Sequence, residues 1–319
     1  MQKSLIFTEG FGCGKILKIA LRSFHQHHDL KVHVFGLPED FEQLDPHHNN
    51  VLIDCSQLDY LKRSYETGHA GTAFIFGKVF SGAINDLRRF TKNPDPSMNL
   101  RQVIHFDSDV YFKKESVSLI EQEFDAGYDI VGSRRAYFKN PANIPIDPSI
   151  PDATSTYFFG CKLDMIPQYD GEYFIRMCQG SINPLGHEVF DFFDPVTFVM
   201  LRNGARIKFL DQEKIGGQNI DGNKKSSFQS NLHLDIGENL AHFGGVGSGY
   251  AYTIDKKKQN ESYGQWAVGR WAIYKKIFFP EETSEVKAGP PVIAADGRWV
   301  HGGYDETLLN LIKGELNLA

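Results

Sequence analysis

The sequence predicts an α/β protein in which a largely parallel, twisted sheet is flanked by helices and followed by a C-terminal helical extension. Short apolar runs alternate with helical patterns up to about residue 132, which is typical of parallel strands joined by crossover helices. One of these runs ends in Asp107–Ser108–Asp109, and open α/β sheets bind their ligands at such strand ends. Amphipathic patterns within residues 251–319 predict that the chain ends in helices.

Composition restricts the class of protein. The chain has 319 residues, 41% of them hydrophobic and 23% charged, which is ordinary for a globular protein. A net charge of −6 argues against a nucleic-acid partner, which selects for a basic face. No stretch approaches the roughly 20 apolar residues of a transmembrane segment. The four cysteines form no C-x-x-C pair, so we expect reduced thiols and a cytoplasmic location.

The first strands and helix follow from periodicity. Apolar runs at 5–8, 32–35 and 51–54 predict three short strands. Between the first two, residues 15–28 place apolar side chains at helical spacing. This order favours parallel strands with a crossover helix.

The glycine-rich loop at residues 10–14 resembles two phosphate-binding motifs and matches neither. A P-loop would need glycine where Glu9 stands and Ser or Thr where Ile16 stands. The dinucleotide fingerprint would need glycine at Leu17. Two interpretations remain for this turn at the ligand edge: main-chain contact with a nucleotide, or a purely structural role.

The stretch after the next apolar run carries the clearest chemical signal. Residues 103–106 predict a buried strand that ends in two carboxylates, Asp107 and Asp109. On an extended backbone residues i and i+2 point to the same side, so both carboxylates would converge on one point. A divalent cation that also binds substrate phosphates would offset their repulsion. The alternative is a solvated turn with no ligand.

Further elements follow along the chain. A helix at 70–90 carries Lys78, which would either reach a phosphate or lie on the surface. The remaining predictions are helices at 115–124, 173–178, 185–201, 263–276 and 306–316, and strands at 128–132, 156–160 and 205–210.

In this order, the motifs resemble those of nucleotide-sugar glycosyltransferases of the GT-A fold. The resemblance rests on the D-x-D in Ile104–Asp109, the acidic helix start at His187–Glu188 and the late His242–Phe243–Gly244, and it covers about residues 3–250. The K-P-W-type segment that follows H-F-x-G in glycogenin-like enzymes is absent. The resemblance implies one catalytic domain over 1–250, with a nucleotide-sugar half (1–132), an acceptor half (133–250) and a C-terminal extension (251–319) packed on it.

The resemblance also implies a metal-dependent transfer of a sugar from a nucleoside-diphosphate sugar to a hydroxyl acceptor such as a glycan. Asp107, Asp109 and His242 would bind Mn²⁺ or Mg²⁺, and the imidazole favours Mn²⁺. Flexible glycines after His242 would let that loop close over the diphosphate. The histidines at positions 25, 27, 28, 47 and 48 are expected on helix or loop surfaces, without a metal role. The residues assigned to the donor are Phe7, Thr8, Glu9, Phe11, Lys78, Asp107, Ser108 and Gly245.

Glu188 and Asp191 are the carboxylates predicted on the acceptor side. They lie three residues apart at a helix start and share one face. One of them would act as a general base in an inverting transfer, or stabilise or attack the reacting carbon in a retaining one. Alternatively, both are ordinary acids favoured by the helix dipole.

Two other functions fit parts of the pattern. A sugar-phosphate nucleotidyltransferase has a similar sheet and glycine loop, but that loop usually carries an Arg and a following Pro where this chain has Lys15–Ile16–Leu17. A non-catalytic nucleotide- or carbohydrate-binding module would need neither Asp109 nor a second carboxylate pair.

Overall fold

The computed structural model describes residues 3–54, 56, 102–135, 153–162, 165, 197, 200–216, 235–254, 262–282 and 306–318. Within this part of the chain no helix is long and apolar enough to cross a membrane.

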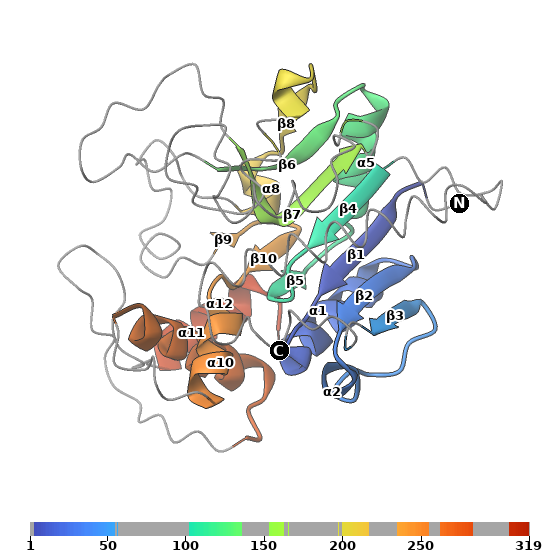
Figure 1. The fold of residues 1–319 in the computed structure, drawn as a ribbon. Helices are drawn as coiled ribbons and strands as arrows, with labels where there is room; N and C mark the ends of the chain where they lie inside the picture. Colours follow the sequence, from blue (N-terminus) through green and yellow to red (C-terminus); the bar gives the residue numbers. More distant parts are fainter. Residues whose placement is uncertain are drawn as a thin grey trace.

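A seven-stranded sheet forms the centre of the molecule (Figure 1). Its strand order is β3-β2-β1-β4-β7-β6-β8, and every neighbouring pair is parallel except the two that involve β7. The predicted α/β class with a largely parallel sheet is therefore confirmed. The strands are β1 (Leu5–Glu9), β2 (Val32–Gly36), β3 (Asn50–Asp54), β4 (Gln102–Phe106), β6 (Ile130–Arg135), β7 (Ala153–Lys162) and β8 (Ile207–Phe209).

A second, three-stranded antiparallel sheet lies at the carboxyl end of β4. Its order is β5-β10-β9, with β5 at Val110–Phe112, β9 at Asp235–Ile236 and β10 at Leu240–His242. Because β5 begins directly after the D-x-D, this small sheet brings residues near 240 to the end of the central strand.

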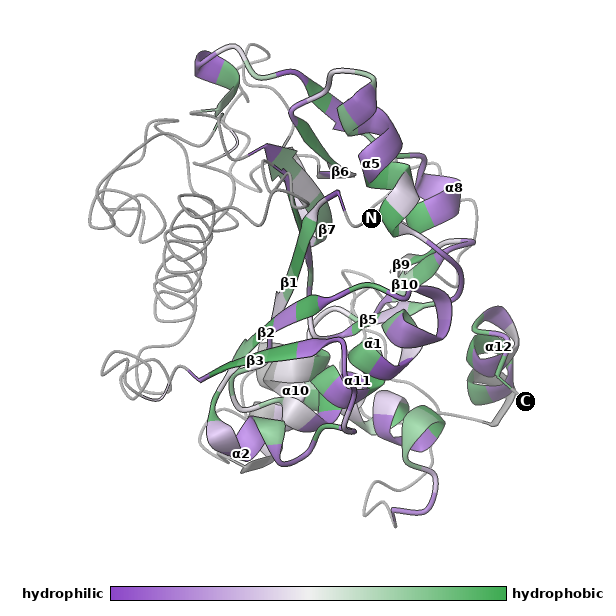
Figure 2. Cartoon of the chain, turned by 90° about the vertical axis from the view of Figure 1, so that its right-hand side faces the viewer, coloured by the Kyte–Doolittle hydropathy of each residue, from purple (hydrophilic) through white to green (hydrophobic). Residues whose placement is uncertain are grey.

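Helices cover the sheet and build the C-terminal region (Figure 1). They are α1 (Gly14–His27), α2 (Pro38–Phe41), α5 (Val117–Asp125), α8 (Gln212–Ile215), α10 (Val246–Ile254), α11 (Ser262–Phe278) and α12 (Glu306–Glu315). Figure 2 shows hydrophobic residues along β1 and β6, and hydrophilic and hydrophobic residues side by side on α5 and α8.

Helix α1 is buried on two faces. Leu17 and Phe24 belong to the core between the sheet and α5, whereas Ile16 and Ile19 belong to a second core with α11 and α12. The Tyr274 hydroxyl on α11 donates to the Ile16 carbonyl at 3.4 Å. The C-terminal helices therefore pack directly on the first helix of the sheet region.

The glycines after His242 begin with a short turn, and α10 starts at Val246; closure of this turn over a diphosphate stays a prediction. One local prediction is wrong. His28 is not on a surface: it is only 4% exposed, at the end of α1. The helical periodicity of α1 does not reveal that the start of α5 covers His28.

Candidate metal centre

The D-x-D lies at the carboxyl end of β4, as predicted, but its backbone is a turn rather than a continued strand. The Asp107 N–H donates to the Tyr157 carbonyl of β7 at 2.9 Å, and the Val110 N–H then donates back to the Asp107 carbonyl at 3.2 Å. The two carboxylates converge because the chain reverses here, and not through the alternation of an extended strand. Ser108, inside the turn, accepts a hydrogen bond from the Cys13 thiol at 3.4 Å.

The β5–β10 pair brings His242 to this turn. Val110 and His242 are partners in the antiparallel ladder, and the Phe243 N–H donates to the Asp109 carbonyl at 3.0 Å. The Asp109 Oδ1 atom lies 3.5 Å from His242 Nε2. Ligand atoms of Asp107, Asp109 and His242 all lie within 4.8 Å of one another.

The His242 ring is held on two sides. It stacks on the Tyr157 ring, with centroids 4.3 Å apart and planes 10° apart. The Tyr157 hydroxyl in turn donates to the Gly216 carbonyl at 2.7 Å, which fixes the tyrosine. At Gly244, a Cβ atom would lie 2.9 Å from the His242 ring, so any larger residue would have to displace the imidazole. The third side chain of the cluster is therefore held in place by its packing.

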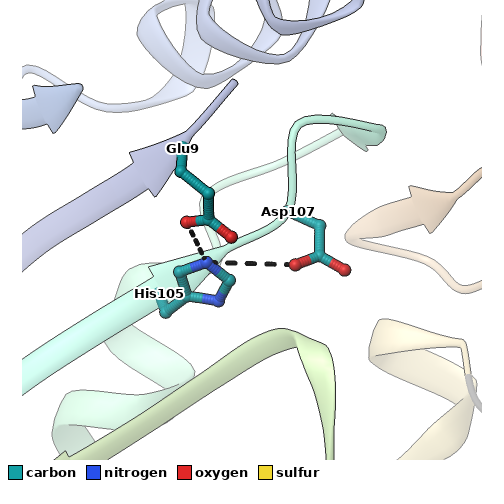
Figure 3. Close-up of side chains that lie close together, drawn as sticks. All are labelled: Glu9, His105 and Asp107. Atoms are coloured by element: carbon teal, nitrogen blue, oxygen red, sulfur yellow. Dashed lines mark hydrogen bonds and ion pairs between the residues drawn. The ribbon is translucent and has the colours of Figure 1, made fainter. Parts of the chain in front are cut away.

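A second group of side chains adjoins the first and shares Asp107 (Figure 3). His105, on β4, is fully buried; its Nδ1 donates to the Thr156 carbonyl at 2.9 Å, because a carbonyl only accepts. Its Nε2 lies 2.7 Å from Glu9 Oε2 and 3.9 Å from Asp107 Oδ1. Burial acts to lower the pKa of His105, but Glu9, Asp107 and the Thr156 carbonyl together outweigh burial, so the pKa is raised.

The cluster concentrates negative charge in a buried place. Burial raises the pKa of Asp107 to about 7; Asp109 and Glu9 add to the rise, and His105 opposes it. A bound cation would offset this cost of ionising Asp107.

The donor set fits a divalent cation. Two carboxylates and one imidazole are ligands that Mn²⁺ accepts, and carboxylates also suit Mg²⁺. Asp107, Asp109 and His242 are the residues that would hold the ion, and their assignment as ligands stays a prediction.

The glycine loop is organised by a carboxylate that sequence reasoning missed. Asp40 is 1% exposed and accepts hydrogen bonds from the N–H groups of Gly12, Gly14 and Leu37, at 3.1, 3.0 and 3.2 Å. Burial raises the pKa of Asp40, and the three N–H groups act against the rise. Two main-chain donors of this loop, the N–H groups of Gly12 and Gly14, are thus already occupied by a side chain, which favours the structural interpretation of the loop.

The structure places the other predicted donor residues in different surroundings. Phe7 is buried against Phe35 and His105, and Thr8 is fully buried, with no hydrogen-bond partner for its hydroxyl among the described residues. Phe11 is half-buried in the turn before α1, and Gly245 has a left-handed φ of 83° just before α10. Lys78, Glu188 and Asp191 lie outside the described residues, so their roles stay predictions.

Sequence reasoning missed two residues that shape the cluster, His105 and Tyr157, and one that shapes the glycine loop, Asp40. A polar residue within the apolar run at 103–106 was the available signal for His105. Nothing in the local sequence of Tyr157 indicates that its ring would stack on His242.

Comparison with known proteins adds little to this geometry. No model of a known protein family matches the chain, and no curated protein matches its sequence. Among solved structures, the apo form of mouse xyloside xylosyltransferase 1 is similar, with a TM-score of 0.42 and 14% sequence identity over 72% of this chain and 93% of that chain. A similarity of this degree establishes neither a shared activity nor a shared substrate.

Proposed function

We propose that the protein is a divalent-metal-dependent glycosyltransferase that moves a sugar from a nucleoside-diphosphate sugar to a hydroxyl acceptor. The observation that carries this proposal is the convergence of Asp107, Asp109 and His242 at the carboxyl end of the central strand. Ligands of open α/β sheets bind at this edge. A divalent cation that is held by carboxylates can also bind the phosphate oxygens of a nucleoside diphosphate.

Each residue has a proposed part in the reaction. When bound by Asp107, Asp109 and His242, the cation would neutralise charge on the departing diphosphate. Tyr157 and Gly244 orient the His242 ring, and Glu9, which ends β1, borders the site on its other side. Glu188 and Asp191 are proposed for the acceptor side, where one carboxylate would take the acceptor proton or stabilise the reacting carbon.

The glycine loop favours this proposal over a sugar-phosphate nucleotidyltransferase. A nucleotidyltransferase loop would need free main-chain donors for a triphosphate, whereas the N–H groups of Gly12 and Gly14 already donate to Asp40.

The test is turnover of a panel of nucleoside-diphosphate sugars with Mn²⁺, measured as released nucleoside diphosphate, with and without hydroxyl acceptors. We expect activity that chelation removes and that Asp109→Asn lowers at least about 100-fold, because a metal ligand supplies several kcal/mol of charge stabilisation. The matched control is Asp125→Asn, which removes an exposed carboxylate on α5 and should leave activity unchanged.

Two results would overturn the proposal. Release of pyrophosphate from a nucleoside triphosphate and a sugar phosphate would identify a nucleotidyltransferase. Binding of nucleotide sugars with no turnover under any metal would identify a binding module.

A further inference from the structure

We propose that Arg270, on α11, is a positioning residue that holds the turn after His242 and thereby fixes the orientation of the His242 imidazole. This inference rests on the cation site of the proposed function, to which His242 would contribute a ligand. It gives the C-terminal helix α11 a part in that site, although Arg270 itself needs no contact with the cation.

The turn after His242 is not fixed by its own sequence. It contains two adjacent glycines, Gly244 and Gly245, and glycine is the residue least restricted in its backbone. The chain is fixed before these glycines, where the Phe243 N–H donates to the Asp109 carbonyl at 3.0 Å, and it is fixed after them, where α10 begins. Between these two points, the orientation of the Gly244 peptide depends on contacts from other parts of the chain.

Arg270 supplies such a contact from a buried position. It is only 2% exposed, and its Nε atom donates to the Gly244 carbonyl at 3.1 Å. Arginine is rarely buried to this extent in proteins. A Cβ atom at Gly244 would lie 2.9 Å from the His242 ring, so Arg270 holds the same backbone that the imidazole packs against.

The packing of α11 on α10 sets the reach of Arg270 (Figure 1). At Gly249, a Cβ atom would lie 1.9 Å from the Ala267 carbonyl oxygen, so the backbones of the two helices are in direct contact there. Ala267, Arg270 and Tyr274 lie at positions i, i+3 and i+7 and therefore share one face of α11. On this face the Tyr274 ring also packs against Phe243, with ring centroids 5.2 Å apart. The helix thus meets the turn through two side chains of one face.

Loss of the Nε donor would remove this support. The Gly244 carbonyl would lose its bond to α11, and the glycine turn that packs against the His242 ring would relax. Loss of an outer group that orients a metal ligand typically lowers metal affinity about 10–100-fold. Because Arg270 acts through the backbone, we expect the lower end of this range, about 10-fold.

The experiment compares two variants that differ at the donor. Arg270→Gln places an amide nitrogen at the same number of bonds from Cα as the arginine Nε, whereas Arg270→Met places a methyl group there. Both variants remove the charge and the terminal nitrogens, so every other contact of the guanidinium is lost equally. We expect Arg270→Met to bind Mn²⁺ about 10-fold more weakly than Arg270→Gln, as measured by titration calorimetry on the full chain without nucleotide. The matched control is Arg22→Met, the same change at an arginine of α1 that is 52% exposed and paired with Asp45, and it should keep the affinity of the parent.

A second measurement reports on the His242 ring itself and needs no metal. Because the ring stacks on Tyr157, its carbon-bound protons should be shifted upfield in the nuclear magnetic resonance spectrum of the metal-free protein. These signals are identified by their absence in His242→Ala. We expect Arg270→Gln to keep the upfield shift and Arg270→Met to reduce it.

Several results would overturn the inference. Equal Mn²⁺ affinities in the two Arg270 variants, or equal His242 shifts, would show that the Nε donor does not position the ring. A comparable loss of affinity in Arg22→Met would show that net charge, and not the turn, controls binding. If the parent binds no Mn²⁺, the metal-dependent function fails, and the His242 shift alone then decides whether Arg270 positions the imidazole.

Discussion

The Asp40 carboxylate gives the glycine loop at residues 10–14 a structural role. Its carboxylate accepts hydrogen bonds from the Gly12 and Gly14 N–H groups at the start of α1 and from the Leu37 N–H group at the start of α2. The close approach of the Asp40 backbone also requires glycine at position 14, because a Cβ atom there would lie 2.4 Å from the Asp40 carbonyl oxygen. One buried carboxylate thus makes this loop part of the scaffold.

The prediction at this site concerns stability. Asp40→Ala leaves three N–H groups without their acceptor, so we expect the free energy of unfolding to fall by about 2–3 kcal/mol, as measured by urea denaturation. The control is Glu39→Ala, which removes the exposed neighbouring carboxylate of the same turn and should change stability by less than about 0.5 kcal/mol. Equal effects of the two variants would contradict this role of Asp40.

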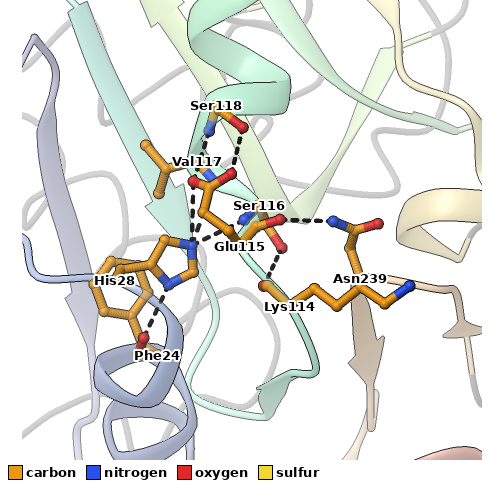
Figure 4. A network of polar contacts seen from close by, with 8 residues as sticks. All are labelled: Phe24, His28, Lys114, Glu115, Ser116, Val117, Ser118 and Asn239. Atoms are coloured by element: carbon orange, nitrogen blue, oxygen red, sulfur yellow. Dashed lines mark hydrogen bonds and ion pairs between the residues drawn. The ribbon is translucent and has the colours of Figure 1, made fainter.

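At the scale of elements, His28 joins the end of α1 to the start of α5 (Figure 4). Its Nδ1–H donates to the Phe24 carbonyl at 2.9 Å, and its Nε2 accepts from the Ser116 N–H at 2.9 Å. An imidazole that accepts at Nε2 and donates at Nδ1 is neutral. The ring thus caps the first N–H groups of α5, those of Ser116 and Val117, from outside the segment, while the N-cap residue itself is Ser116.

This cap predicts a pH dependence of stability. Burial lowers the pKa of His28 below its usual 6.5, although the Phe24 carbonyl and Glu115 act in the opposite direction. The unfolded chain therefore binds the proton more readily, so the contribution of His28 is fully present above about pH 6.5 and is lost as the pH falls below it. The loss should approach about 1.4 kcal/mol per pH unit.

The measurement is the free energy of unfolding between pH 8 and about pH 5 for the parent and for His28→Phe, which cannot titrate. The slope below about pH 6.5 should be smaller in the variant. His27→Gln, which changes an exposed histidine one residue earlier, should keep the slope of the parent. A variant slope equal to that of the parent would assign the pH dependence to other groups.

The elements differ in how far the sequence predicts them. Strands β1, β2 and β4 were predictable because they are buried apolar runs, and α1 because its apolar spacing is helical. The antiparallel direction of β7 was not, because strand periodicity is the same in both directions. The capping role of His28 was also missed, since it depends on a helix start far along the chain.

The candidate ligands of the metal centre were predictable from the sequence, but the contacts that hold these side chains in place were not. The order of motifs singled out Asp107, Asp109 and His242, and the fold brings all three together. Their convergence, however, comes from a turn and from the β5–β10 ladder, and the stacking of Tyr157 joins residues that are distant in sequence. Such long-range contacts leave no periodic signal in the sequence.

At the scale of the whole molecule, the candidate metal centre joins parts of the chain that are far apart. Asp107 and Asp109 follow β4, while His242 ends β10, and Tyr157 links the cluster to β7. The β10 segment continues through Phe243 into the core that α1 shares with α11 and α12. A cation held by these residues would therefore connect the large sheet, the small sheet and the C-terminal helices.

Mn²⁺ should consequently stabilise the whole fold. A ligand that binds only the folded state adds about 2.7 kcal/mol at a free concentration 100 times its Kd, so we expect a Tm that rises with Mn²⁺ concentration. His242→Ala should abolish this rise, because it removes one ligand of the ion, whereas His48→Ala, at an exposed loop histidine, should keep it. Hydrogen exchange should then slow in β4, β5 and β10 together, since all three are tied to one ion. A rise in Tm that persists unchanged in His242→Ala would place the cation elsewhere and contradict this centre.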